Sequence, residues 1–167
     1  MIAPPEFLVQ LFKPWADFYG QSKVADTIVT FMHVAGLLLA GGMAVSMDRA
    51  TFRALRRPAG ERADHLAELA ALHPWVLTGL GVIVASGAMM LAADIETYYG
   101  SWIYWTKMAL VVALLVNGFQ MTRAEQDLRA DATETATGWE KLHRTSKRST
   151  ALWFTIALLG VALTNLA

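Results

Sequence analysis

Four long apolar runs dominate the pattern of hydrophobic and polar positions along the chain. They cover residues 24–47, 69–92, 102–121 and 150–166, and we expect the last helix to begin slightly earlier, near residue 148. Each run is close to the roughly 20 residues that an α-helix needs to cross about 30 Å of hydrocarbon. Because a bilayer offers no water to pair backbone amides, such segments must be helical. The pattern therefore predicts an all-α membrane protein, a single domain over residues 1–167 built as an antiparallel bundle of four transmembrane helices.

The first 23 residues show a different pattern, with apolar side chains close to i, i+3, i+4 spacing: Phe7, Leu8, Leu11, Phe12, Trp15 and Phe18. This spacing is typical of an amphipathic helix that lies in the membrane interface. An extended segment leading into the first span is the alternative. The stretch lacks a basic leader and a continuous apolar core, so we do not expect it to be a signal peptide.

Lysine and arginine are distributed unevenly between the polar segments. Residues 48–62 carry five arginines and residues 122–148 carry six basic side chains, whereas residues 93–101 carry none. By the positive-inside rule, both basic loops lie in the cytoplasm. We therefore expect a multi-pass protein of a bacterial inner membrane, with its N-terminus and C-terminus in the periplasm. We interpret residues 122–148 as a partly helical, solvated extension of the third and fourth helices.

The composition excludes several classes of function. Only 17% of the residues are charged, against about 25% in soluble domains. The net charge is zero and no basic patch is present, so we expect no nucleic-acid partner. The absence of cysteine excludes disulfides, thiol redox chemistry and thiolate metal sites. The predicted spans contain no carboxylate pair, and we find no phosphate loop or nucleophile–base arrangement, which argues against hydrolysis and nucleotide chemistry.

Small residues are frequent in the first two predicted helices: Gly36, Gly41 and Gly42 in the first, and Gly79, Gly81, Ser86 and Gly87 in the second. Small residues let helix backbones approach closely in lipid. They also leave room for a flat cofactor beside a helix. The sequence does not separate these two uses.

Few ionisable side chains fall inside the predicted spans. A charged side chain at the centre of a span costs about 2.5–3.5 kcal/mol on insertion scales, so it is retained only with a partner or a task. From the rise of the helix, His33 lies roughly 13 Å and Lys107 roughly 8 Å below the outer boundary, so they can serve one site. His73 lies in the inner half, on the same side as His65 and His143, which we place at or near the cytoplasmic surface.

A haem held by two histidines from facing helices needs both at nearly one height. His33 and His73 differ by roughly 10 Å along the membrane normal, which disfavours this pair without excluding it. An outer site would use His33 as an axial ligand, with Lys107 as the second ligand or as a cation for a propionate. His73 and His143 form an alternative inner pair if the fourth helix begins near Trp139, and a homodimer could supply a missing ligand.

Each of these side chains also has a purely structural interpretation. A lone histidine can hydrogen-bond to a neighbouring helix, and Lys107 can extend its ammonium toward the headgroups. The chain has eight methionines, which are copper ligands in some proteins. Their positions, such as the Met89–Met90 pair, are also typical of residues that fill packing gaps.

Several short motifs together resemble a known group of proteins: "MHVAGLLLAGG", "DRATFRALRR", "HPWVLTGLGVIVASG" and "WIYWTKMALVVALLVNG". Over roughly residues 24–166 the chain resembles the small four-helix membrane proteins of the copper-resistance D-like family and the haem-binding HemJ-type protoporphyrinogen oxidases. The resemblance to the HemJ type implies that His33 and Lys107 belong to a haem site. The acidic and asparagine signature expected in that family's inner loop is not evident here, and the chain has no Met-x-x-Met or His-rich cluster for copper.

Three functions follow as hypotheses. In the first, the protein is a b-type cytochrome or membrane anchor that passes electrons between a periplasmic redox partner and a membrane carrier such as quinone. In the second, it is an accessory subunit of a larger membrane complex and its histidines only join helices. In the third, it is a porphyrinogen oxidase or a copper-handling protein. The expected partners are the lipid bilayer and other membrane or periplasmic redox subunits or further copies of this chain.

Overall fold

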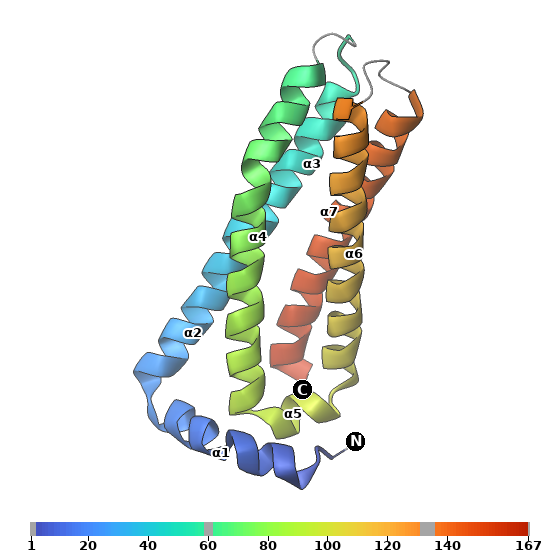
Figure 1. The fold of residues 1–167 in the computed structure, drawn as a ribbon. Coiled ribbons are helices and arrows are strands. Elements are labelled where there is room, and N and C mark those ends of the chain that lie inside the picture. Colours follow the sequence, from blue (N-terminus) through green and yellow to red (C-terminus); the bar gives the residue numbers. More distant parts are fainter. Residues whose placement is uncertain (1–2, 59–61, 131–135, 167) are drawn as a thin grey trace.

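The computed structural model describes residues 3–58, 62–130 and 136–166, and within them the chain is helical without β-strands (Figure 1). The elements in order are α1 (Glu6–Gln21), α2 (Lys23–Gly36), the π-helical turn η1 (Leu37–Gly41), α3 (Gly42–Ala54), α4 (Arg62–Ala93), α5 (Ile95–Gly100), α6 (Trp102–Ala130) and α7 (Ala136–Leu166).

Four helical segments are long and apolar enough to cross a membrane: Lys23–Ala54, His65–Ala93, Trp102–Ala130 and Thr137–Leu166. The first joins α2, η1 and α3 end to end. Large apolar side chains cover the outside of these helices, with Phe31 and Leu38 both 70% exposed and Leu158 68% exposed. Apolar surface on this scale is unusual for a monomeric soluble protein. The chain is therefore a multi-pass membrane protein with an all-α fold.

The helices extend beyond the apolar runs into segments that we expected to be solvated. Met121, Leu128, Trp139 and Leu142 are buried together with Met47, Leu66 and Leu69 in one apolar cluster. Our interpretation of residues 122–148 as a solvated extension is therefore wrong for one face of α6 and α7. Most charged residues of this segment, such as Arg123, Asp127 and Arg144, are exposed on the other face. Spacings of three and four residues place the apolar residues in the core.

The helices pack in two close pairs, α2 with α4 and α6 with α7, and α4 touches α6 only sparsely. Near the basic segments α3 packs on both α4 and α7 and joins the pairs. Toward α5 and the two chain ends the pairs diverge (Figure 1). The bundle is therefore held most tightly at the end where α3 lies.

The helix α1 lies across the end of the bundle near α5 (Figure 1). None of its residues is buried, and Phe7, Leu11 and Phe18 are 67%, 65% and 55% exposed. One long-range hydrogen bond fixes its position, because the Trp15 indole Nε1 donates to the Met89 carbonyl at 2.8 Å. The helix therefore presents a row of aromatic and aliphatic side chains outward from the bundle.

Two glycines allow α2 and α4 to approach closely. A Cβ on Gly79 would lie 2.9 Å from the Ala40 Cβ, and a Cβ on Gly36 would lie 2.9 Å from Ile83 Cγ1. Both distances are shorter than van der Waals contact. At these two positions the small residues therefore allow close helix packing. The other use that the sequence left open, space for a flat cofactor, does not apply to them.

We expect Gly79→Ala to lower the free energy of unfolding by about 1–3 kcal/mol, the usual cost of overpacking a close contact. Gly81→Ala is the matched control, because nothing lies within 4 Å of a Cβ at this position of the same helix. Denaturant unfolding of both variants in one detergent measures the difference. Equal stabilities would contradict the close approach of the two helices.

Candidate functional site

The His33 side chain is half-buried on α2 and faces α4. Its Nδ1 lies 3.0 Å from the Ser86 hydroxyl oxygen. The ring lies beside Gly87, where an added Cβ would be 3.4 Å from His33 Cε1. Two of the small residues on α4 therefore frame the imidazole.

The hydrogen bonds of Ser86 assign the tautomer of His33. The Ser86 hydroxyl lies 2.6 Å from the Val82 carbonyl and 3.2 Å from the Ile83 carbonyl of its own helix. Its single hydrogen is donated to this backbone, so its oxygen accepts a hydrogen bond from His33 Nδ1–H. The neutral ring then keeps its lone pair on Nε2. Histidines that bind metals are commonly held in this way, with the other ring nitrogen donating to a fixed acceptor.

Lys107 is half-buried on α6 and lies on the same side of the bundle as His33. The His33 ring is within electrostatic range of its ammonium. Its Nζ is 3.7 Å from the position of a Cβ on Gly160 of α7, so a glycine backs this side chain as well. Within the described residues the ammonium makes no hydrogen bond or ion pair. The structure therefore places the two predicted residues of the outer site near each other.

The structure gives His73 a different environment. Its Nδ1 lies 3.2 Å from the Leu69 carbonyl, and its Nε2 lies 3.2 Å from the Thr122 hydroxyl of α6. Both ring nitrogens are thus occupied. Ser86, the partner of His33, lies 13 residues after His73 on α4, which corresponds to about 20 Å along the helix. In this conformation His33 and His73 do not reach one iron.

The other two histidines are also separate from the His33 region. His143 on α7 packs edge-on against Phe52 of α3, with 5.4 Å between the ring centroids. The alternative inner pair of His73 and His143 therefore stays a prediction. His65 is buried in the bundle near the basic segments, and its Nε2 lies 3.0 Å from the Thr51 hydroxyl.

Two buried carboxyl groups were missed by the sequence analysis. Asp48 is 0% exposed and Glu125 is 3% exposed, and both lie within helices long enough to span a membrane. Both residues lie beyond the spans that the sequence predicts, residues 24–47 and 102–121, but inside the longer helices of the structure. Glu125 could have been found from its spacing, because it follows Asn117 and Met121 at intervals of four residues on one helical face.

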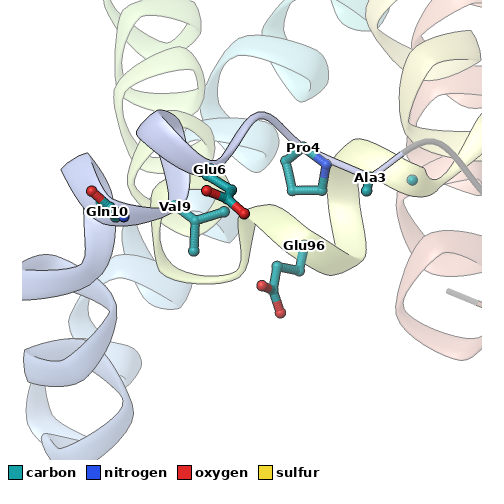
Figure 2. A pocket seen from close by; sticks show the side chains of 7 residues that line it. Ala3, Pro4, Glu6, Val9, Gln10 and Glu96 are labelled. Atoms are coloured by element: carbon teal, nitrogen blue, oxygen red, sulfur yellow. The ribbon is translucent and has the colours of Figure 1, made fainter.

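An open pocket of about 440 Å³ lies between α5 and the N-terminal segment with α1, away from these histidines. It is lined by Ala3, Pro4, Glu6, Val9, Gln10, Glu96 and Gly100 (Figure 2). The carboxylates of Glu6 and Glu96 are exposed, and no basic or aromatic group lines the pocket. We assign it no chemistry.

Comparison of the chain with models of protein families, with curated proteins and with solved structures gave no match. The resemblance to the copper-resistance D-like and HemJ-type proteins therefore stays a hypothesis. Any function must be argued from the geometry.

We expect Ser86→Ala to lower the free energy of unfolding by about 0.6–1.7 kcal/mol, the range for hydrogen bonds between membrane helices. Ser46→Ala is the control, because Ser46 is exposed on α3. Denaturant unfolding in one detergent compares the two. An effect of Ser86→Ala no larger than that of the control would mean that His33 does not bond to Ser86.

Proposed function

We propose that the protein is a b-type haem protein of the bacterial inner membrane that passes electrons to or from a membrane carrier. One observation carries this proposal. The His33 ring is oriented by Ser86 through Nδ1, at 3.0 Å, and keeps Nε2 free. A neutral imidazole nitrogen that is oriented in this way and makes no other hydrogen bond is able to serve as an axial ligand of haem iron.

The surrounding residues fit a flat, anionic group such as haem b. Lys107 is a half-buried cation in electrostatic range of His33, suited to a propionate or to a second axial position. Gly87 and Gly160 leave space beside the two polar side chains. When bound, haem supplies one-electron chemistry, and the protein sets its potential through the axial ligand and through burial. Ser86 holds the ligand ring in place and makes it more basic.

The chain crosses the bilayer as an antiparallel bundle in this proposal. The arginine-rich end near α3 faces the cytoplasm, and the end with α5, α1 and both termini faces the periplasm (Figure 1). The exposed side chains of Phe7, Leu11 and Phe18 then enter the outer interface. His33 and Lys107 are thereby placed in the outer half, within reach of a periplasmic redox partner.

A groove of about 460 Å³ between α6 and α7 supports a quinone as the membrane carrier. Its walls are mostly apolar, formed by residues such as Leu110, Val116 and Leu152, while Asn117, Gln120 and Arg148 supply polar groups. An apolar pocket with few polar groups is typical of small-molecule sites. Asn117 lies ten residues after Lys107, about 15 Å along α6.

A second candidate function is that of an accessory subunit of a larger membrane complex. His33 with Ser86 and His73 with Thr122 already form hydrogen bonds between helices. Both histidines therefore have a packing role that needs no cofactor. A colourless protein that copurifies with a larger membrane partner would support this function over the first.

We expect the purified protein to show a b-type band in dithionite-reduced minus oxidised spectra, and His33→Ala to lose or displace this band. His143→Ala is the matched control, because His143 packs against Phe52 away from His33. Expression with added haem ensures that a missing band does not reflect a shortage of haem in the cells. A band that is unchanged in His33→Ala would refute the assignment of the ligand.

Cysteine labelling tests the orientation of the chain in the membrane, since the natural chain contains no cysteine and a single one can be introduced at a chosen position. We expect Glu96→Cys, at an exposed position on α5, to react with an impermeant maleimide in cells whose outer membrane alone is permeabilised. Arg56→Cys, exposed at the basic end, should react only after the inner membrane is opened. The reverse pattern would invert the proposed topology.

A further inference from the structure

The two buried carboxyl groups lie in one polar cluster near the basic end of the bundle. Asp48 of α3 and Glu125 of α6 are within electrostatic range of each other. Ser146, Ser149 and Thr150 of α7 face Asp48, and the Thr150 hydroxyl donates to Asp48 Oδ2 at 3.0 Å. The Asp48–Thr150 bond joins α3 to α7, but neither this contact nor the haem proposal accounts for the unpaired oxygen on each acid.

The charges around the two carboxyl groups differ. Glu125 has two basic neighbours, since His73 Nδ1 of α4 lies 3.5 Å from its Oε2 and Arg129 of α6 lies one turn away. Asp48 is faced by hydroxyl groups from α7 and by the acidic Glu125 from α6. On its own helix, Arg49 and Arg53 are exposed. Within the described residues Asp48 therefore lacks a countercharge.

An ionised carboxylate without a partner charge is strongly disfavoured in an apolar interior, and a second negative charge nearby adds to the cost. Two unpaired atoms show where a proton would be held. Asp48 Oδ1 and Ser146 Oγ both lack a hydrogen-bond partner, and both residues are 0% exposed. Glu125 Oε1 is unpaired as well, but Glu125 has basic neighbours that favour its ionised form. A proton on Oδ1 makes Asp48 a donor, and the Ser146 oxygen that faces it becomes the acceptor.

We propose that Asp48 is a buried proton-binding site, whose carboxyl takes up a proton as the pH falls below neutral while Glu125 stays ionised beside its basic neighbours. The proton exchanges with the outside through Glu125 and His73, because the His73 side chain is 23% exposed and opens the cluster to its surroundings. His65 is not part of this route, since the charged groups in its range are Glu68, Arg57 and Arg53 and not the two buried carboxyl groups. The protein thereby carries one exchangeable proton on the side of its basic segments.

Infrared spectroscopy tests this site on the full chain in detergent, because a protonated carboxyl has a C=O stretching band distinct from that of a carboxylate. We expect the band to appear in the natural protein as the pH is lowered from neutral, and to shift in deuterium oxide. We expect Asp48→Asn to abolish the band, whereas Glu125→Gln and Asp127→Asn retain it. Asp127 is a suitable control because its side chain is 73% exposed on the same helix as Glu125.

Isotope labelling keeps the test decisive even if a variant fails to fold. Carboxyl-labelled ¹³C-aspartate in the natural sequence should shift the band, whereas carboxyl-labelled ¹³C-glutamate should leave it in place. A band that responds only to labelled glutamate would assign the proton to Glu125 and overturn the proposal. The absence of a protonated band, with melting temperatures that rise on adding sodium or potassium chloride, would also overturn it in favour of a bound cation.

Discussion

Hydrogen bonds between side chains of different helices hold this bundle together, because hydrocarbon offers no other partner to a buried polar group. The contacts form a connected series through α2, α4, α6, α7 and α3: His33 with Ser86, His73 with Thr122, Asn117 with the Thr145 carbonyl, and Asp48 with Thr150. Since α3 continues α2 through η1, the series closes on itself. Each helix of the bundle is thereby linked to its neighbour by at least one polar contact.

The polar groups are not distributed evenly along this ring. Near α1 and α5 the two helix pairs diverge, and His33 lies within electrostatic range of Lys107. Near α3 the helices pack closely and surround Asp48, Glu125 and His73. The two proposals therefore concern opposite ends of the molecule. A half-buried imidazole with an unbonded nitrogen is suited to holding haem iron, and a buried acid without a countercharge is suited to proton binding.

The sequence predicted the features that depend on local pattern. Apolar runs located the spanning helices, and the helical rise placed His33 and Lys107 at similar depth. What it missed depends on packing between distant segments. Asp48 follows an apolar run, and the sequence pattern therefore predicts it to be the first residue of a loop. Its burial depends on its contact with Thr150, which lies 102 residues away in the chain. Glu125 lies among charged residues, and only the packing of α6 against α4 and α7 turns it inward. The free nitrogen of His33 likewise depends on Ser86, which lies 53 residues along the chain.

The central claim is that His33 leaves one ring nitrogen free in order to hold a haem. The most direct measurement is a pyridine haemochrome assay on the natural protein, purified in mild detergent after expression with ample haem. The account predicts haem b at a stoichiometry near one per chain. A preparation that is folded and monodisperse but contains no haem would contradict it, and His33 would then be a residue that only joins α2 to α4.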